Sequence, residues 1–578
     1  MIKRKYLIAN IIPLIPLPPN SPTYFTYFAD FPLKTGALVE IDFRKKIIPG
    51  YVLEVKELEK SRQEIINLLP KLKKIRKIIK EKTLIRKEEI QFAQFLAGYF
   101  GFSLASVFSF FYFPAKAFLE INSQASEEKI KRNFKIFFRE DLDSKILIKK
   151  RNLLIVPEIS FFEEVSQFFE KLKLPYLKFS PPWNKEKIKK LAQELKERDK
   201  KTILIPKHLV FLPWKNIDQL IVFREGSFFY YDNFKKVNFD YRDLIFKLAQ
   251  IKRIPLILID RLPSLQSVKF LKLEIKLPLK IEVINDLEEI LKIIKTYQKI
   301  IFFFPQKIVY GLRCELCFNS LKCPRCQSNL VFKEDKIFCL LCSREIKFDK
   351  NLCPFCQQKL ELGFKRLGLI SFYKFLKKNY PEETYLVLKK RKKNLKILKN
   401  KSKFFLLGSL NLLSGHLPEA EALIFFNFEN FYLTSDPFLR EKYLRILAFF
   451  QEKVATIFLV SNLRNLEIEK KIYQGSYFQE IIKERELLRL NPFYKIIKLI
   501  KGSSDFDKLQ KQMLKISQEL KNILKEAEVI GPVLAKPFRF KKRYFLEIII
   551  RTQKEDFKLQ EVLKIYQFEK IKINPLEI

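Results

Sequence analysis

Hydrophobic and polar residues alternate over much of residues 1–56, and this pattern predicts a series of β-strands. Residues 57–90 form a basic stretch with helical periodicity, interrupted by Pro70. The run from Gln91 to Ala115 then contains no charged residue. It is long enough to span a bilayer, but its glycines, glutamines and serines favour a buried helix that turns into an aromatic loop.

Short buried strands alternate with amphipathic helices between residues 128 and 300. Strands are expected at 153–156, 176–179, 202–205, 220–223 and 255–259, and helices at 161–172, 185–200 and 241–252. Strand–helix alternation at this spacing predicts a parallel α/β sheet. A second segment of the same kind runs from 363 to 485, so we expect two α/β lobes.

The C-terminal segment has the element order β-α-β-β-α-β. Strands are expected at 494–500, 529–533, 544–551 and 570–573, and helices at 503–527 and 557–566. This order is that of the ferredoxin-like split unit. The expected fold is therefore α/β and multidomain, with a β-rich N-terminal domain and a ferredoxin-like C-terminal domain.

All eight cysteines lie between residues 314 and 356, in four Cys-x2-Cys pairs. Two thiolates on a tight turn can occupy two corners of a tetrahedron around one zinc ion. We expect two structural zinc ions, one held by Cys314, Cys317, Cys353 and Cys356, the other by Cys323, Cys326, Cys339 and Cys342. Disulfides and a rubredoxin-like iron site are the alternatives.

The chain carries 110 Lys and Arg against 65 Asp and Glu, a formal net charge of +45. Such a surface favours polyanionic partners, nucleic acid first and anionic membranes second. An A/T-rich coding bias is the alternative explanation for the excess of lysine. Prolines interrupt the apolar run after the basic N-terminus, so we expect no signal peptide and a cytoplasmic location.

The 13 glycines exclude two common nucleotide-binding motifs. None is followed by Lys-Ser or Lys-Thr, and no Gly-x-Gly-x-x-Gly is present. A phosphate-binding loop needs glycines because consecutive backbone N–H groups must approach the anion. Nucleotide hydrolysis through a Walker-type loop is therefore not expected.

Several short segments follow one another as in a known family. Leu153–Ile159 ends in Val-Pro-Glu-Ile, Pro263–Ser267 reads Pro-Ser-Leu-Gln-Ser, and Asp436–Arg440, Arg489–Phe493 and Gly531–Val533 add weaker matches around the cysteine segment. In this order the chain resembles, from end to end, the bacterial primosomal replication-restart helicases of the PriA (primosomal protein N′) family.

The resemblance implies five domains. These are an N-terminal domain that binds DNA 3′ ends (1–120), helicase lobe 1 (121–300), a zinc-binding module (301–362), helicase lobe 2 (363–485) and the ferredoxin-like domain (486–578). The family acts as an ATP-dependent 3′ to 5′ DNA helicase, and its zinc module contacts single-strand-binding protein and primosome loaders.

Four departures from the family affect catalysis. Phe137–Lys145 has no glycine where the family has its P-loop, and Phe223–Gly226 replaces Asp-Glu-Glu-His, so Arg224 would add a cation beside any magnesium. Leu258–Leu262 replaces Gly-Ser-Ala-Thr, and Leu447–Thr456 lacks the arginines and glycines of the last motif. Because phosphate cradle, metal ligand and arginine finger are all missing, we expect no binding of ATP or Mg²⁺ and an inactive helicase.

The DNA-binding candidates come from both ends of the chain. Phe25-Thr26-Tyr27 stands where the family has Phe-Asp-Tyr, and Phe43-Arg44 where it has Phe-Gly. The candidates are Phe25, Tyr27, Arg44, Lys45, Lys46, Arg539, Lys541, Lys542 and Arg543.

The sequence thus favours a PriA-like protein that binds branched or fork DNA in replication restart and primosome assembly, with unwinding lost. Its expected partners are DNA and, from the resemblance, single-strand-binding protein and primosome loaders, with no membrane. The alternatives are a zinc-ribbon scaffold that binds nucleic acid or protein without a restart role, and an active helicase with unusual motifs.

Overall fold

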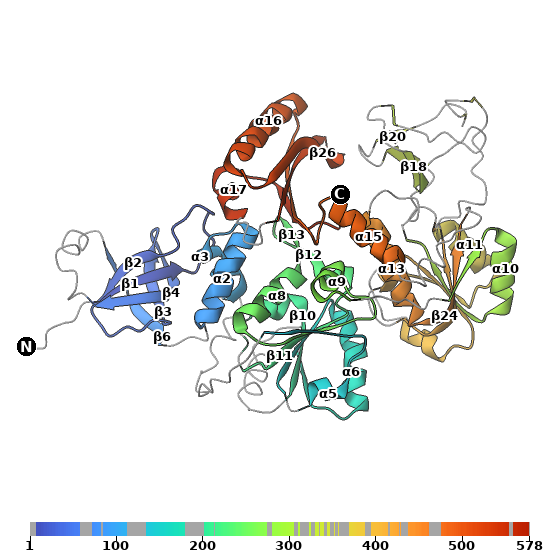
Figure 1. Ribbon diagram of the computed structural model, residues 1–578, viewed down its shortest axis with the longest axis horizontal. Helices are drawn as coiled ribbons and strands as arrows, with labels where there is room; N and C mark the ends of the chain where they lie inside the picture. The colour runs from blue at the N-terminus through green and yellow to red at the C-terminus, as the bar shows by residue number, and fades with distance from the viewer. Residues whose placement is uncertain are drawn as a thin grey trace, which may run out of the picture.

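The computed structural model describes most of the chain. The described residues are 7–57, 72–81, 85–112, 134–148, 150–179, 201–212, 214, 216–273, 280–305, 310–311, 323–324, 330–333, 336–339, 344–346, 352, 356–357, 369–387, 395–413, 417–426, 428, 437–461, 476–540, 542–553 and 559–576. Within them the N-terminal sheet lies at one end of the molecule and the second α/β lobe at the other, with the C-terminal domain above the first lobe (Figure 1).

The N-terminal domain is a six-stranded sheet in the order β5-β2-β1-β4-β3-β6. Its strands are β1 (Leu7–Pro13), β2 (Phe25–Ala29), β3 (Leu38–Phe43), β4 (Lys46–Glu57), β5 (Lys73–Lys74) and β6 (Lys77–Lys80). The helical prediction for the basic stretch is wrong over 73–80, because this backbone pairs with β2 and β3 instead.

Two helical segments follow this sheet. Helix α2 (Lys87–Phe100) ends at Gly101, and α3 (Leu104–Val107) continues into the π-helical turn η3 (Phe108–Tyr112), so part of the expected aromatic loop is helical. No single helix in the described segments has the length and apolarity to cross a membrane. The bent pair Lys87–Phe100 and Leu104–Phe111, meeting at 109°, passes that test together by length and composition.

Lobe 1 is built on a parallel sheet in the order β7-β14-β11-β8-β10-β9. The strands are β7 (Ile136–Arg139), β8 (Asn152–Val156), β9 (Tyr176–Lys178), β10 (Thr202–Pro206), β11 (Gln219–Phe223) and β14 (Leu256–Ile259); the helices include α5 (Ser144–Leu147), α6 (Phe162–Lys171), α8 (Tyr241–Lys252) and α9 (Leu265–Leu271). The predicted parallel α/β sheet is confirmed, and its central strands are buried along their whole length.

Lobe 2 is a second parallel sheet, in the order β15-β24-β23-β16-β22-β21. Its strands are β15 (Ile281–Ile284), β16 (Lys299–Phe303), β21 (Thr384–Val387), β22 (Phe404–Gly408), β23 (Ala420–Phe425) and β24 (Val454–Val460); its helices include α10 (Leu287–Thr296), α11 (Leu369–Asn379) and α13 (Pro437–Gln451), and α15 (Ser476–Leu487) leads to the C-terminal domain. Because β15 pairs with β24, residues 281–300 belong to lobe 2, and the lobe boundary expected at 300 is too late.

The C-terminal domain has the predicted β-α-β-β-α-β order. It comprises β25 (Lys495–Ser503), α16 (Phe506–Ile523), β26 (Glu528–Phe540), β27 (Arg543–Thr552), α17 (Leu559–Ile565) and β28 (Lys570–Ile573), with antiparallel strand order β28-β25-β27-β26. Lobe 1 adds a hairpin to this sheet, β12 (Tyr231–Phe234) and β13 (Val237–Asp240), since β13 pairs with β28. The hydrophobic pattern of the sequence did not predict this hairpin.

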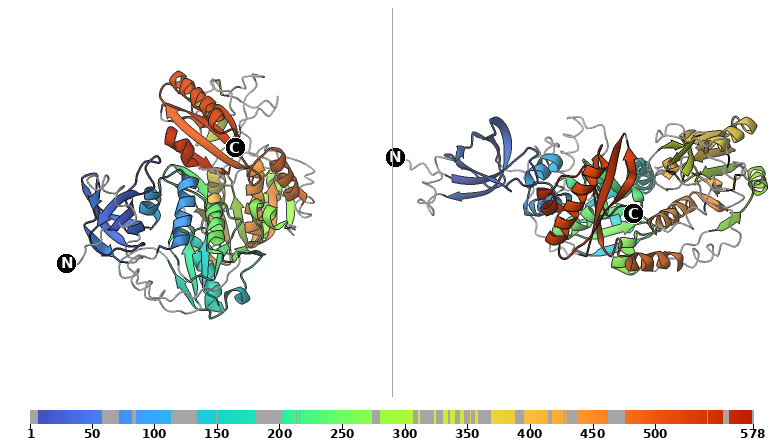
Figure 2. Two further views of the ribbon diagram at one scale, coloured as in Figure 1. Left: turned by 60° about the vertical axis from the view of Figure 1, so that its left-hand side comes forward. Right: turned by 90° about the horizontal axis from the view of Figure 1, so that it is seen from above.

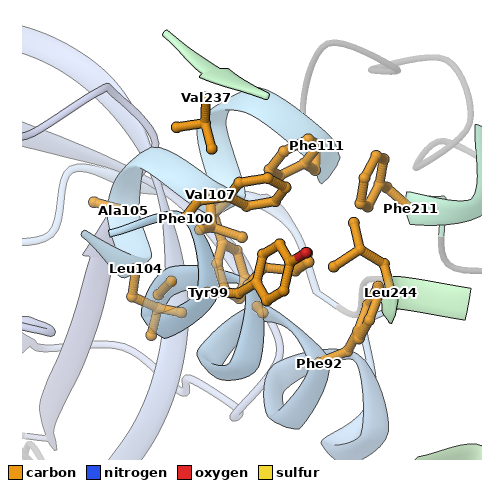
Figure 3. Packing of buried hydrophobic residues seen from close by; sticks show 14 of the residues in the cluster. Phe92, Tyr99, Phe100, Leu104, Ala105, Val107, Phe111, Phe211, Val237 and Leu244 are labelled. Carbon is orange, nitrogen blue, oxygen red and sulfur yellow. The ribbon is translucent and has the colours of Figure 1, made fainter. Parts of the chain in front are cut away.

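One apolar core joins the N-terminal domain, lobe 1 and the C-terminal domain. The ring of Phe100 on α2 meets that of Phe239 on β13 at 4.7 Å, and Phe111 meets Phe211 of lobe 1 at 4.3 Å. Figure 3 shows these helices packing Phe100 and Phe111 toward Phe211 and Val237 of lobe 1. The three domains are therefore held together by burial of aromatic surface.

Substitution of Gly101 tests this packing. Gly101 has φ +69°, and an added Cβ would lie 2.4 Å from Leu563 Cδ1 on α17. Gly101→Ala should lower the free energy of the first unfolding transition by about 2–4 kcal/mol. Gly36→Ala is the control, because Gly36 has φ +87° but no atom closer than 3.9 Å to the added Cβ. If urea denaturation shows equal losses of unfolding free energy in Gly101→Ala and Gly36→Ala, the contact with α17 contributes nothing to stability.

Candidate DNA-binding, zinc and interlobe sites

Three predicted cations form the tip of the β3–β4 hairpin. Arg44 and Lys45 have φ values of 47° and 63°, and the pair Phe43–Lys46 closes this tight turn. Arg44, Lys45 and Lys46 are all exposed, and the Arg44 guanidinium lies 5.5 Å from the centre of the Phe43 ring. The structure thus brings these three side chains together on one projecting turn.

The aromatic residues beneath this turn differ in exposure. The rings of Phe25 and Phe43 meet edge to face at 4.8 Å, and Phe25 is half-buried. Against our expectation of a DNA contact, Tyr27 lies in the core with 4% exposure, and its hydroxyl donates to the Asp42 carbonyl at 3.0 Å. Burial, together with Asp42, raises the pKa of Tyr27 to about 12. Tyr27 therefore supports the β3–β4 turn from below.

The second group of predicted cations lies at the tip of the β26–β27 hairpin. Arg539 stacks 4.9 Å from the centre of the Tyr544 ring, and Lys542 is exposed. Arg543 pairs with Glu569 and donates to the Gly502 carbonyl at 2.9 Å, so part of its charge is used within the domain. Lys541 lies outside the described residues. Figure 2 places this C-terminal domain apart from the N-terminal sheet in both views, so the two basic groups are on separate domains.

Two features of these surfaces are not evident from the sequence. Phe540 at the β26–β27 tip is 52% exposed, although such a residue would usually be expected in the core. Lys73 is exposed on β5, beside β2; it was assigned to a helix, and no local signal placed it on the sheet. Both become visible only when strand pairing is known.

The described part of the zinc module is a small antiparallel sheet of β17 (Tyr310–Gly311), β18 (Leu330–Lys333), β19 (Lys336–Cys339) and β20 (Glu345–Ile346). Cys323 and Cys339 are buried, at 0% and 1% exposure, and Cys356 is partly buried. The Cys339 amide donates to the Arg344 carbonyl at 2.9 Å, which closes the loop after β19. Buried thiols at the end of a hairpin fit zinc, a metal that prefers sulfur ligands.

The remaining predicted ligands, Cys314, Cys317, Cys326, Cys342 and Cys353, lie outside the described residues. Among the residues that are described, no three His, Cys, Asp or Glu side chains are placed to hold a metal ion. The proposed division of the cysteines between two ions therefore stays a prediction.

In lobe 1 a segment that departs from the family, Phe223–Gly226, meets one that resembles it, Pro263–Ser267. Glu225 is fully buried. Its carboxylate accepts hydrogen bonds from the Ser264 amide at 2.7 Å, from the Ser267 hydroxyl at 2.8 Å and from the Ser264 hydroxyl. The Arg242 guanidinium donates to the Glu225 carbonyl at 2.8 Å. The segment after β11 is thus tied to the Pro-Ser-Leu-Gln-Ser turn through one buried carboxylate.

The segment expected to replace the P-loop follows β7, which pairs in parallel with β14. Only residues 140–143 separate β7 from α5, and Asp143 caps that helix by accepting from the Lys145 amide at 3.0 Å. Glu140 and Asp141 precede it and are exposed. Carboxylates therefore stand where a phosphate-binding loop needs glycines and free N–H groups.

Arg224 joins the two lobes. It follows β11 with φ 55° and pairs with Glu164 on α6 of lobe 1 at 2.6 Å and with Glu452 of lobe 2 at 2.5 Å. Arg224 and Glu452 are 13% and 10% exposed. The sequence placed Arg224 beside a hypothetical magnesium ion, whereas the structure shows a buried salt bridge between lobes. Its partner across the cleft, Glu452, belongs to the segment that lacks the arginines and glycines of the last family motif.

A second arginine strengthens this interlobe contact. Arg445 on α13 donates to the Leu262 and Pro263 carbonyls of lobe 1 at 3.0 and 2.9 Å, and pairs with Glu441. Glu441 also pairs with Arg485 at 2.5 Å. Burial alone would raise the pKa of Glu441, but Arg485 and Arg445 outweigh it and lower the pKa to about 2. An added Cβ on Gly226 would lie 2.2 Å from Arg445, so the lobes approach closely here.

Comparison with known proteins identifies two parts of the chain. Residues 14–112 match the family described as 3'DNA-binding domain (3'BD), and residues 321–373 match the double zinc ribbon. Replication restart protein PriA of Helicobacter pylori is 29% identical over 395 residues, covering 59% of this chain and 60% of the relative. Over this length the chain is similar to a PriA protein. PriA proteins of Borreliella burgdorferi and Thermotoga maritima are 25% and 22% identical over 305 and 408 residues, covering 48% and 63% of this chain and 44% and 54% of the relatives.

The similarity spans about 60% of the length of the Helicobacter PriA relative. In this PriA-like chain the matched 3'DNA-binding segment contains the β3–β4 turn with Arg44, Lys45 and Lys46, and it ends at Tyr112 in η3. The double zinc ribbon match contains Cys323, Cys339 and Cys356. The interlobe arginines lie outside both matched segments.

A double-mutant cycle on Arg224 and Glu452 tests the salt bridge between the two lobes. Arg224→Met should lower the free energy of unfolding by about 2 kcal/mol, because Glu452 loses its shorter ion pair and keeps Arg261 at 3.6 Å, while the part-exposed Glu164 loses its partner. Glu452→Gln should cost less, since Arg224 keeps Glu164. We expect a coupling energy of about 1–3 kcal/mol in urea denaturation. Strictly additive losses would mean that the two side chains do not interact.

Asp260 gives stability a defined pH dependence. Burial raises its pKa from 3.8 to about 6, although Arg224 and Arg445 act in the opposite direction. The folded carboxyl holds its proton more tightly than the unfolded one. Its contribution to the free energy of unfolding is therefore fully present below about pH 4 and is lost as the pH rises through about 6. The stability lost over this range is about 3 kcal/mol. Asp260→Asn should therefore gain stability relative to wild type between pH 4.5 and 7. A pH-independent difference in urea denaturation would contradict this assignment.

Proposed function

We propose that this chain binds branched DNA at replication forks and takes part in replication restart without ATP-driven unwinding. The observation that carries the proposal is the match of residues 14–112 to a 3'DNA-binding domain whose β3–β4 turn presents Arg44, Lys45 and Lys46. Exposed cations on a projecting turn can contact phosphates without rearrangement. The basic β26–β27 hairpin offers a second contact on another domain.

Loss of unwinding is supported by the interlobe region. A phosphate cradle is replaced by the acidic segment 140–143, and Arg224 bridges Glu164 and Glu452 in the cleft between the lobes. A helicase converts nucleotide binding and release into relative movement of its lobes. A buried salt bridge opposes that movement because separation would leave charges unpaired.

The zinc segment supports a structural role for two bound zinc ions. It also supports a second candidate function for the chain. The double zinc ribbon match and the buried Cys323 and Cys339 support metal-dependent folding of this module. In the proposed role it would contact single-strand-binding protein and primosome loaders. If fork binding fails, the same module supports an interaction scaffold that binds nucleic acid or protein without a restart role.

Fluorescence anisotropy with a three-way fork carrying a 3′ nascent end tests DNA binding. Linear duplex and single strand of equal phosphate count are compared at low and physiological salt. We expect at least about a tenfold preference for the fork, unchanged by ATP and Mg²⁺. The triple variant Arg44→Ala/Lys45→Ala/Lys46→Ala should lower fork affinity about tenfold and reduce the salt slope by about 2–3.

Lys374→Ala/Lys377→Ala/Lys378→Ala on α11 is the matched control, because it removes three positive charges from lobe 2. Equal losses of fork affinity in both triple variants would show that Arg44, Lys45 and Lys46 contribute only through their net charge. Equal affinity of wild type for all three DNAs would favour the scaffold function. DNA-stimulated ATP hydrolysis would refute the loss of unwinding.

Metal analysis tests the zinc module. Mass spectrometry of the purified chain should find two zinc ions, and Cys323→Ser/Cys339→Ser should retain one, since both residues belong to the same predicted site. Cys314→Ser/Cys317→Ser should also retain one ion. Iron in place of zinc, or loss of both ions in either variant, would contradict two independent zinc sites.

A further inference from the structure

Asp243 in the first turn of α8 is the point where three domains meet. Its Oδ2 accepts a hydrogen bond from the Tyr99 hydroxyl of the N-terminal segment at 2.8 Å and from Asn574 Nδ2 of the C-terminal domain at 3.1 Å. Its Oδ1 accepts from Gln266 Nε2 of lobe 1 at 3.3 Å. One carboxylate of lobe 1 thus binds donors from both domains that carry the basic hairpins.

Burial and neighbouring charges shift the pKa values of both Tyr99 and Asp243. Burial, followed by the charge of Asp243, raises the pKa of Tyr99 well above its ordinary value, so its hydroxyl remains protonated. Burial and Asp240 raise the pKa of Asp243, while Lys495 lowers it. Lys495 also lies 4.8 Å from the centre of the Tyr99 ring. Asp240, Lys495 and Tyr99 are the titratable groups that act on Asp243.

The helices around Asp243 pack closely. Helix α2 contacts both α8 of lobe 1 and α17 of the C-terminal domain, and an added Cβ at Gly101 would lie 2.4 Å from Leu563 on α17. The pairing of β13 with β28 joins lobe 1 to the C-terminal domain, while α2 of the N-terminal domain is held by side-chain packing. Hydrogen bonds to one carboxylate restrict the orientation further, because each donor must point at a defined oxygen.

We propose that Asp243 is a positioning residue that fixes the N-terminal and C-terminal domains relative to each other and thereby sets the preference for branched over linear DNA. This inference rests on the proposed function. A branched DNA that contacts both basic hairpins at once gains affinity only if their separation matches its arms. Linear DNA can bind either hairpin alone and is insensitive to their relative placement.

Asn574 allows a nearly isosteric test. Its Oδ1 accepts from the Ile496 amide at 3.1 Å, while its Nδ2 donates to Asp243. Asn574→Asp keeps the side-chain shape and the acceptor for Ile496, but replaces the donor by a second carboxylate facing Asp243. The double variant Asp243→Asn/Asn574→Asp restores the contact between positions 243 and 574 with reversed polarity and the net charge of the wild type. Because Asp243 Oδ2 also accepts from Tyr99, the Tyr99 hydroxyl must then act as an acceptor for the introduced amide, which a phenolic hydroxyl can do.

The experiment measures domain placement and DNA preference in the same full-length variants. Dyes on non-natural amino acids replace Lys56 and Lys515, which are 65% and 78% exposed in the N-terminal and C-terminal domains. We expect Asn574→Asp to broaden the energy-transfer distribution without DNA and to lower the fork-to-linear affinity ratio about fivefold. Linear affinity should change less than twofold, and the double variant should recover both properties. Asn285→Asp, at an exposed position of lobe 2, is the charge-matched control.

Each outcome bears on the proposal. An unchanged energy-transfer distribution in Asn574→Asp, or a broadened one with an unchanged affinity ratio, overturns it, as does a loss that the double variant fails to recover. Equal losses of fork and linear affinity would show general destabilisation and also refute it. Failure of the proposed function is distinguishable, because it appears in the wild type as absence of any fork preference; the specificity role of Asp243 is then refuted too.

Discussion

The aromatic core between α2, lobe 1 and the C-terminal domain is the constraint on which the rest of the molecule depends. Phe100 and Phe111 bury their rings against Phe239 and Phe211, and burial of such rings supplies most of the free energy that keeps domains together. The core explains why the N-terminal sheet, the parallel α/β lobe 1 and the C-terminal β-α-β-β-α-β domain form one arrangement. The hydrogen bonds at Asp243 and the pairing of β13 with β28 add direction to this apolar association.

The cleft between the lobes follows a different physical rule. Charges buried there must be paired, because an isolated buried charge costs several kcal/mol. Arg224 meets Glu164 and Glu452, and Arg445 and Arg485 meet Glu441. The charges of these side chains are therefore paired within the protein.

The positively charged residues behind the net charge of +45 have two different roles in the structure. Arg224, Arg445 and Arg485 are used in internal ion pairs, and Arg543 is engaged by Glu569. The cations of the β3–β4 turn are exposed instead and remain available to a polyanion. Composition therefore indicates a polyanionic partner, whereas the fold separates the cations that can reach it from those that hold the protein together.

Local patterns were sufficient for much of the fold. The period of buried residues predicted the parallel strands around Leu153–Val156 and helix α8, and element order predicted the ferredoxin-like domain, because these features depend on neighbours in the chain. Cysteine spacing likewise indicated zinc, since the two members of each ligand pair are close together in the sequence.

Tertiary structure decided what depends on distant partners. Lys73–Lys80 carries a helical pattern but forms strands, because β2 and β3 offer backbone partners. The β12–β13 hairpin joins the C-terminal sheet across more than 300 residues, and Tyr27 turns inward to Asp42. Arg224 and Asp243 acquire their roles only when residues from other domains approach them. Hydrophobic periodicity indicates which face of an element is buried, but not which residues bury it. At each of these positions the distant partner determined the structure.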